Sequence, residues 1–422
     1  MKIPNLKTFG LNLLKHPLFS GSAIMIFGSN LANFVAYLYH LVIGRLLGPA
    51  PYGELSAVLS VLGLIFASLN FLGLVIVKFV SSAKKDELVS IYSWFTKKSV
   101  VAGLGLALLV LILTPFFSNF LHIKTTTFLL TVPILSFSVA SFVYRSFLQG
   151  LLKFKEVVIA INLDFIFRLA LGVLFISLGF SSFGAVLGMV FSMGLSFLFL
   201  KYFLREYHAI EKVKPFGRTK EVLKYATPIF FATVATNSMF SSDVVLVKHF
   251  FSPHDAGIYA SLSTLGKIIF FGAGPVGAVM FPMISKRHSI GAGYKKIFLL
   301  SLLLTSLIAF GVLLIYWLAP ELSIKILYGN EFIEGAPYLV WIGAFMTLFT
   351  LSSLVLNYFL SRNKTTVAIT VVISALIQII GIWLFHETIL SVLKVSIVSS
   401  SLFLASLLLY FAYEAKNASS RK

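Results

Sequence analysis

The chain has no cysteine among its 422 residues, which excludes disulfide bonds, thiolate metal sites and cysteine nucleophiles. Acidic residues are also few, with 15 Asp and Glu against 34 Lys and Arg, and charged residues make up only 12% of the chain. No connector is long enough to form a soluble domain. The motifs of P-loop nucleotide binding, HExxH metalloproteases and GxSxG hydrolases are missing as well. The sequence therefore does not indicate an enzyme.

Long apolar runs fill the chain instead. Hydrophobic residues make up 58% of it and the mean hydropathy is +0.96, far above an ordinary globular chain. A helix needs about 20 apolar residues to cross the core of a bilayer. The sequence therefore predicts an all-α polytopic membrane protein with about twelve transmembrane helices. The expected spans are 19–44, 55–79, 99–118, 127–149, 157–180, 182–203, 225–248, 258–285, 297–319, 336–360, 365–385 and 391–411.

The net charge of +19 is distributed unevenly between the connectors. If the first residues are cytoplasmic, the connectors on that side hold 25 Lys and Arg and those on the outer side hold five. This asymmetry follows the positive-inside rule. It predicts a multi-pass protein of the cytoplasmic (inner) membrane with both termini in the cytoplasm. The basic surplus is then explained by topology and by contact with anionic membrane lipids, and no nucleic-acid partner is expected.

A shift of 204 residues lays one half of the chain over the other without a gap. The matching residues are Asn33 with Asn237, Pro49 with Pro253, and Gly53 with Gly257. Chance similarity between apolar helices is the alternative, but Pro, Gly and Asn match here rather than Leu and Val. Because the shift keeps an even helix count, we expect two pseudo-symmetric six-helix bundles around a central cavity, a transporter architecture. The expected domains are 1–203, a cytoplasmic linker at 204–224, and 225–422.

Two charged residues of the fifth span lie four positions apart. Asp164 and Arg168 share one helix face and lie within ion-pair reach. A charge at mid-bilayer depth costs at least about 2.5–3.5 kcal/mol, so one that persists usually faces an interior cavity. One interpretation is a structural salt bridge between helices. The other is that Arg168 binds substrate in an aqueous cavity while Asp164 modulates or releases it, which makes Asp164 a candidate ion-coupling residue.

A second charged pair is expected across the turn between the seventh and eighth spans. Asp243 and Lys267 lie at comparable depth and are able to pair. Such a pair would either orient the hairpin or form a site where Asp243 binds a coupling H⁺ or Na⁺ when Lys267 turns away. No other cofactor and no metal is expected.

Three further polar residues are candidates for substrate binding. Arg145 lies about two turns from the cytoplasmic end of the fourth span, where snorkelling to lipid headgroups is the alternative interpretation. The repeat-related Asn33 and Asn237 are the best cavity candidates among the uncharged polar residues, which otherwise form hydrogen bonds between helices.

The eighth span contains a candidate hinge in the segment FFGAGPVGAVMFPM. Gly274 and Gly277 flank Pro275, which removes one backbone hydrogen bond of the helix. Interrupted spans are typical of transporter gates, and a passive kink is the alternative.

The chain resembles the polysaccharide (O-antigen-type) flippases of the multidrug/oligosaccharidyl-lipid/polysaccharide exporter superfamily. The segments that carry the resemblance are IFGSNLANFVAYLYHLVIGRLLGPAPYGELSAV, RSFLQGLLKFKEVVIAINL and SSDVVLVKHFFSPHDAGIYASLSTLGKIIF. The resemblance implies two six-helix bundles with a V-shaped cavity, a MATE-like exporter fold. It also implies export of a polyprenyl-pyrophosphate-linked oligosaccharide to the outer leaflet by alternating access. In such a cavity Arg168, Lys267 and Arg145 match the basic lining, and Asp243 falls where members often carry an acidic residue.

The expected function is therefore that of a flippase for cell-surface polysaccharide assembly, with glycan-assembly enzymes as further partners to consider. Three alternatives stay open: an ion-coupled multidrug antiporter of the same fold, a membrane glycan polymerase or ligase, and a scaffold for glycan-assembly enzymes. The polymerase is disfavoured because the largest outer loop, near 320–335, is short.

Overall fold

The computed structural model describes residues 17–81, 83, 85–208, 219–290, 292–362 and 364–419, and within them every regular element is a helix. The elements, in chain order, are α2 (Pro17–Leu47), α3 (Pro49–Ser81), α4 (Lys85–Phe120), α5 (Thr125–Leu129), α6 (Thr131–Gly150), α7 (Phe154–Ser177), α8 (Ser181–Phe203), α9 (Arg205–His208), α10 (Thr219–Phe250), α11 (Pro253–Ser289), α12 (Lys295–Leu318), α13 (Pro320–Leu327), η1 (Asn330–Gly335), α14 (Ala336–Ser361), η2 (Thr365–Val367), α15 (Ala368–Leu384) and α16 (Ile389–Ser419). The all-α prediction is confirmed.

Each expected span overlaps a helix of at least 17 residues. Within the described residues, nine helical segments are long and apolar enough to cross a membrane, and α15 is a shorter apolar helix of 17 residues. The two remaining expected spans fall on α2 and α10, which have 31 and 32 residues. At 1.5 Å per residue these helices exceed the thickness of a bilayer core.

Both repeat-related prolines begin helices. Pro49 is the first residue of α3 and Pro253 the first of α11, where its missing N–H leaves no donor unpaired. Ser252 caps α11, because its hydroxyl accepts a hydrogen bond of 3.1 Å from the backbone N–H of Asp255. Gly48, between α2 and α3, has a φ of 70°, a conformation that favours glycine.

Contacts between Cα atoms group the chain into two compact units. The first comprises Met1–Leu47 and Ser68–Phe230, and the second comprises Gly48–Ala67 and Phe231–Lys422. The start of α3 thus belongs with the second unit. The predicted linker at 204–224 includes residues 209–218, which lie outside the described part of the chain, so the predicted domain boundaries stay a prediction.

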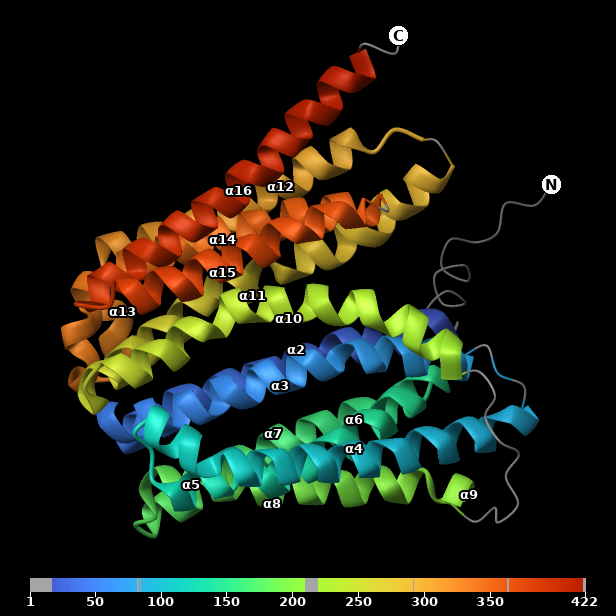
Figure 1. The fold of residues 1–422 in the computed structure, drawn as a ribbon, viewed down its shortest axis with the longest axis horizontal. Coiled ribbons are helices and arrows are strands. Elements are labelled where there is room, and N and C mark those ends of the chain that lie inside the picture. The colour runs from blue at the N-terminus through green and yellow to red at the C-terminus, as the bar shows by residue number, and fades with distance from the viewer. Residues whose placement is uncertain are drawn as a thin grey trace, which may run out of the picture. The chain divides into compact units, whose positions relative to one another are not determined.

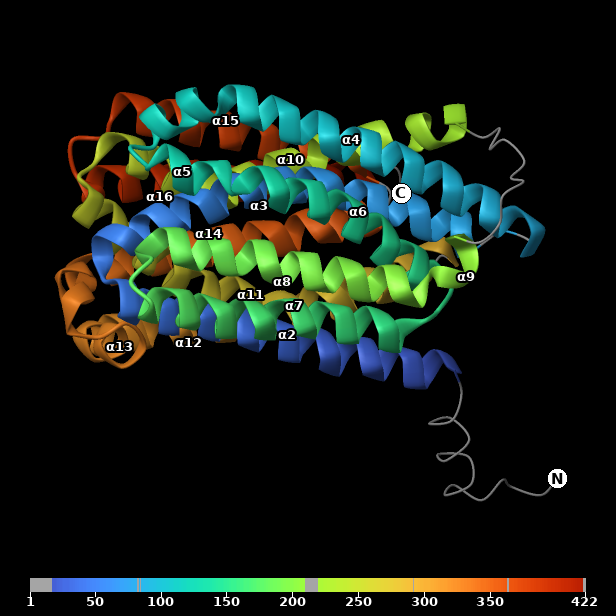
Figure 2. The ribbon, with the colours of Figure 1, turned by 90° about the horizontal axis from the view of Figure 1, so that it is seen from below.

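The first unit is held together by close helix packing. Helix α7 packs against α8 and α2, and α6 packs against α4 and α8; Figure 2 shows α7, α8 and α6 side by side. At the α7–α8 crossing, a Cβ on Gly188 would lie 2.8 Å from the backbone nitrogen of Gly172. Glycine lets the two backbones approach, which places the polar side chains of α7 and α8 within reach of one another.

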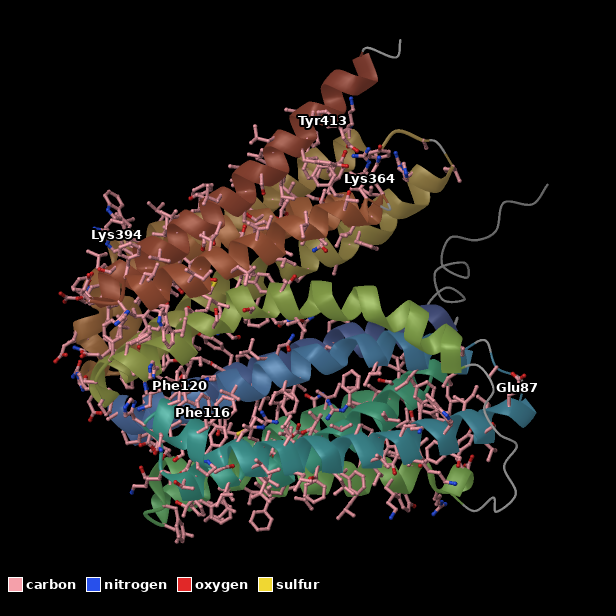
Figure 3. All side chains as sticks on the ribbon, in the orientation of Figure 1. Glu87, Phe116, Phe120, Lys364, Lys394 and Tyr413 are labelled. Carbon is pink, nitrogen blue, oxygen red and sulfur yellow. The ribbon has the colours of Figure 1, made fainter. Side chains whose placement is uncertain are left out.

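The second unit packs around α14. This helix contacts α11, α12 and α16, and α16 also contacts α15 (Figure 1). Phe345, Phe349 and Phe359 of α14 are fully buried. Just beyond the C-terminal end of α14, Nη1 of Arg362 lies 2.7 Å from Oε2 of Glu414 on α16. Nζ of Lys364, a residue labelled in Figure 3, lies 3.4 Å from Oε1 of the same glutamate.

Large apolar side chains cover the outer faces of several helices. On α4, Phe116 is 60% exposed and stacks on Phe120 near the end of the helix (Figure 3). On α12, Leu303, Leu307 and Phe310 are exposed in the same way. In water such continuous apolar faces would cause association, whereas in a membrane they face lipid. The protein is therefore a multi-pass membrane protein.

Candidate functional site

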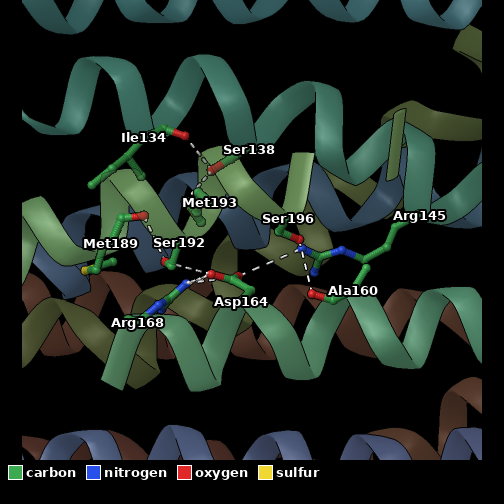
Figure 4. Close-up of polar contacts among 10 residues, drawn as sticks. All are labelled: Ile134, Ser138, Arg145, Ala160, Asp164, Arg168, Met189, Ser192, Met193 and Ser196. Atoms are coloured by element: carbon green, nitrogen blue, oxygen red, sulfur yellow. Dashed lines mark hydrogen bonds and ion pairs between the residues drawn. The ribbon is translucent and has the colours of Figure 1, made fainter. Parts of the chain in front are cut away.

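A buried carboxylate on α7 organises a polar cluster in the first unit (Figure 4). Asp164 accepts hydrogen bonds of 3.2 and 3.1 Å on its two oxygens from Nη2 of Arg168, one helical turn later. The pair predicted from the spacing of these residues is confirmed. The guanidinium also lies over the ring of Phe165, 4.9 Å from its centroid, so an aromatic face contributes to holding the cation.

A second arginine reaches the same carboxylate from α6. Nη2 of Arg145 lies 4.0 Å from Oδ2 of Asp164, and its side chain is 27% exposed against 12% for Arg168. Arg145 therefore points toward the cluster, which argues against simple snorkelling. Two cations share one anion, so the cluster carries a formal net charge of +1. The Nε atoms of both arginines have no hydrogen-bond partner within the described residues.

Serines of α8 complete the cluster. Ser192 donates a hydrogen bond of 3.0 Å to Oδ1 of Asp164, and Ser196 donates one of 3.1 Å to the backbone oxygen of Ala160. Neither serine was predicted from the sequence, although their four-residue spacing on an apolar helix was a usable signal. With Arg168 and Ser192, the carboxylate is well supplied with donors. Arg145, at the edge of ion-pair distance and more exposed, is the cation with most capacity for an external anion.

A second buried acid lies in the second unit. Asp243 of α10 has no exposed surface and accepts a hydrogen bond of 2.8 Å on Oδ2 from the hydroxyl of Tyr259 on α11. Tyr259 also interacts with Ser396 of α16, which accepts a hydrogen bond of 3.2 Å from Nε2 of Gln378 on α15. This polar network therefore joins four helices.

The polar network of Asp243, Tyr259, Ser396 and Gln378 has spare acceptors. All four side chains are fully buried. Within the described residues, neither Oδ1 of Asp243 nor Oε1 of Gln378 has a hydrogen-bond partner. Buried acceptors without donors are costly in an apolar interior. A proton or a small cation bound to the network would satisfy them.

The predicted direct pair between Asp243 and Lys267 is not formed. Lys267 interacts electrostatically with Asp243, but among the described atoms no ion pair within 4.0 Å joins them. Instead Nζ of Lys267 lies over the ring of Phe240, 4.5 Å from its centroid. Tyr259, two helical turns before Lys267 on α11, takes the contact with the carboxylate.

The other candidate residues lie on three helices. Asn33 on α2 is exposed, and Asn237 on α10 is half-buried. Helix α11 continues unbroken through Gly274, Pro275 and Gly277. The space around Gly274 is open, with no atom within 4 Å of a Cβ built there. The roles assigned to these residues stay predictions.

The fold is similar to that of solved transporters of the MOP superfamily. Three solved structures cover nearly the whole chain. One is described as the inward-facing conformation of a multidrug resistance MATE family transporter of that superfamily, with a TM-score of 0.71, 14% identity, and coverage of 91% of this chain and 95% of that chain. A second, lipid II flippase MurJ in an inward closed conformation, has a TM-score of 0.71, 15% identity, and coverage of 92% and 87%. An outward-facing MATE family transporter has a TM-score of 0.61, 18% identity, and coverage of 98% of both chains.

The family model described as "Polysaccharide biosynthesis protein" matches residues 19–288, so the chain belongs to that family. No curated protein matches the chain. The resemblance noted in the sequence is therefore confirmed at the level of family and fold.

Proposed function

We propose that the protein is a flippase that moves a polyprenyl-pyrophosphate-linked oligosaccharide from the cytoplasmic to the outer leaflet of the cytoplasmic membrane. It would do so by alternating access, for cell-surface polysaccharide assembly. The observation that carries the proposal is the cluster of Arg145, Asp164 and Arg168, a net cation inside a membrane bundle of a polysaccharide biosynthesis protein. A multidrug antiporter for cationic compounds would have no use for such a site.

The chemistry of the cargo matches this cluster. A sugar chain needs a hydrated path, whereas the lipid tail is able to stay in the bilayer. A pyrophosphate linker needs cations, and a guanidinium offers a fork of donors to phosphate oxygens. Outward movement of about two negative charges gains roughly 4–5 kcal/mol per 100 mV when the cytoplasm is negative. The membrane potential therefore favours export.

Each member of the cluster has a distinct role in this proposal. Arg145 makes the first contact with the linker because it is the more exposed cation. Arg168 is held by Asp164 until the linker competes for it, and Asp164 recovers it when the linker leaves. Lys267 provides a further cation in the second unit, where it rests on Phe240 between substrate contacts.

The exposed part of α2 is divided into a polar and an apolar sector, which supports a role for Asn33 in the glycan path. Asn30 and Asn33 are exposed on one sector, and Phe27, Leu31 and Phe34 are exposed on another, about 100° away around the helix. An amide without a hydrogen-bond partner in hydrocarbon costs about 2–7 kcal/mol. We infer that the apolar sector faces lipid and the polar sector faces water, where amides bind sugar hydroxyls. Asn237 is proposed to do the same on α10.

Cysteine labelling tests this division, because the natural chain has no cysteine. In Asn33→Cys, a water-soluble methanethiosulfonate reagent should label the thiol at least about tenfold faster than in Leu31→Cys, since only a hydrated thiol ionises and reacts readily. The measurement is the labelling rate in intact membranes, with Phe34→Cys as a second lipid-facing control. Equal rates at the three positions would contradict a hydrated sector.

Ion coupling is proposed at Asp243. The buried network around Asp243 supports it, because the free oxygens of Asp243 and Gln378 are suitable partners for H⁺ or Na⁺. Bending of α11 near Gly274, Pro275 and Gly277 is proposed to link this site to the transport cycle, since the proline lacks an N–H and the space around Gly274 is open.

The same acid also favours a second candidate function, ion-coupled antiport of small molecules. Lipid analysis of a deletion strain separates the two. The flippase proposal expects a lipid-linked oligosaccharide to accumulate on the inner leaflet, with glycan-assembly enzymes as the proteins that make and use it. Antiport instead expects drug sensitivity with normal lipid-linked glycan. Normal lipid intermediates and a normal cell surface would overturn the flippase proposal.

A further inference from the structure

Two cations share one carboxylate near the C-terminal ends of α14 and α16. Arg362 and Lys364 each contact a different oxygen of Glu414, at 2.7 and 3.4 Å. Figure 3 labels Lys364 and Tyr413, the residue before Glu414, at this end of the second unit. Among the described residues, Glu414 is the one acid in ion-pair contact with either cation. The cluster of these three charged residues therefore carries a formal net charge of +1.

Aromatic rings fix the position of Arg362. Its guanidinium lies 5.1 Å from the ring centroid of Tyr358 and 5.5 Å from that of Tyr294, which precedes α12. Nη1 also donates a hydrogen bond of 3.3 Å to the hydroxyl of Tyr358. Arg362 follows the last residue of α14, where the helix dipole favours a cation. The charge is thus held in place from three helices, as in a built binding site.

The two cations have more N–H donors than the protein supplies with acceptors. Within the described residues, the carboxylate of Glu414 and the hydroxyl of Tyr358 accept from them, and Nε of Arg362 has no hydrogen-bond partner. The side chain of Lys364 is 45% exposed, against 14% for that of Arg362. Lys364 is therefore the cation that an external anion reaches first, and Arg362 adds its charge from behind.

Exposed apolar side chains continue from this charged end along two helices. On α16, Leu409 and Tyr413 lie one turn apart on the same face and are 72% and 63% exposed, next to Glu414. On α12, Lys296 is exposed, and Leu300, one turn further into the helix on the same face, is 55% exposed. A ligand with an anionic head and apolar tails matches this arrangement, because the charges and the apolar surface adjoin.

We propose that Arg362, Lys364 and Glu414 form a binding site for the phosphate of an anionic phospholipid, in the leaflet on the side predicted to be cytoplasmic. The phosphate binds Lys364 and is attracted by Arg362, and the acyl chains lie along the exposed face of α16. A soluble phosphate compound would gain nothing from the apolar surface, so the surface favours a lipid. The site goes beyond the proposed function and does not depend on the transported cargo.

Titration of the purified protein in detergent with phosphatidylglycerol, followed by native mass spectrometry, tests the site. One basic side chain near a lipid phosphate contributes about fivefold to affinity, so Lys364→Gln should raise the Kd of the first bound lipid by about that factor. Glu414→Gln should instead lower this Kd, because it removes the anion that competes for both cations. A purely structural ion pair predicts no gain in lipid affinity in Glu414→Gln.

The matched control is Lys97→Gln. Lys97 on α4 is exposed on the side predicted to be cytoplasmic, and exposed Val101 lies one turn further on the same face. Among the described residues Lys97 has no ion pair within 4.0 Å. The general surface charge of the protein would make both lysines matter equally, whereas the proposed site predicts an unchanged Kd in Lys97→Gln.

Two further probes separate the lipid from other ligands. Phosphatidylcholine, which has no net charge, should bind more weakly than phosphatidylglycerol. Glycerol 3-phosphate, which has the phosphate but no acyl chains, should bind at least about 100-fold more weakly, because each buried CH₂ group adds to the affinity. The proposal is overturned by an unchanged Kd in Lys364→Gln, by an equal loss in Lys97→Gln, or by either probe binding as tightly as phosphatidylglycerol.

Discussion

Arg145→Ala should lower glycan export by about 10- to 100-fold while leaving the amount of protein in the membrane unchanged. A hydrogen bond to a charged group is worth about 1.5–3 kcal/mol, and each 1.4 kcal/mol is a factor of ten. Arg145 is the more exposed cation of the cluster and is not needed to neutralise Asp164, which Arg168 already pairs. Surface glycan and membrane-inserted protein, measured in the same cells, check the prediction.

Removal of both cations should have a larger effect. Arg145→Ala/Arg168→Ala is expected to abolish export, and Arg145→Lys to retain part of it, because lysine keeps the charge but loses the fork of donors. Arg205→Ala is a matched control: Arg205 is exposed and rests on the ring of Tyr202, away from the cluster.

The structural interpretation of the cluster predicts a different outcome. If the charges only lock α6, α7 and α8 together, a neutral replacement of all three, Arg145→Gln/Asp164→Asn/Arg168→Gln, should keep export, because buried ion pairs are often replaceable by uncharged groups. The flippase proposal expects this variant to insert normally and to export nothing.

Asp243→Asn should remove the dependence of transport on an ion gradient and reduce the rate by at least about tenfold. Asparagine has the size of aspartate and is able to accept the hydrogen bond from Tyr259, so the polar network keeps its shape and loses only its charge. Transport in proteoliposomes under an imposed H⁺ or Na⁺ gradient measures this effect directly.

The Tyr259→Phe variant is the control for Asp243→Asn. It removes one donor but keeps the ionisable carboxylate, so its transport should be weakened and still respond to the gradient. If Asp243→Asn transports at the normal rate with an unchanged gradient response, Asp243 is a structural residue and the ion site lies elsewhere.

Local sequence patterns predicted the helices and one ion pair. Every expected span falls on a helix because about 20 apolar residues in a membrane protein have no alternative structure. Asp164 and Arg168 meet because an interval of four residues fixes their geometry on one helix.

Contacts between helices required the structure. Arg145 and Ser192 join Asp164 only through the rotation and depth of α6 and α8, which no interval in the sequence encodes. The same limitation applies to Asp243 and Lys267, because the rotation of α11 presents Tyr259 to the carboxylate and Lys267 to Phe240. The 204-residue period identified Gly53 and Gly257 as equivalent, but it did not predict that their backbones touch.

Flipping by the purified protein tests the central proposal most directly. The protein would be reconstituted into liposomes with a polyprenyl-pyrophosphate-linked oligosaccharide that carries a fluorophore on its sugar, and a membrane-impermeant quencher would be added outside. The flippase proposal predicts loss of nearly all fluorescence with the natural protein, and loss of about half with Arg145→Ala/Arg168→Ala or with empty liposomes. Quenching that stops at about half with the natural protein as well would contradict it.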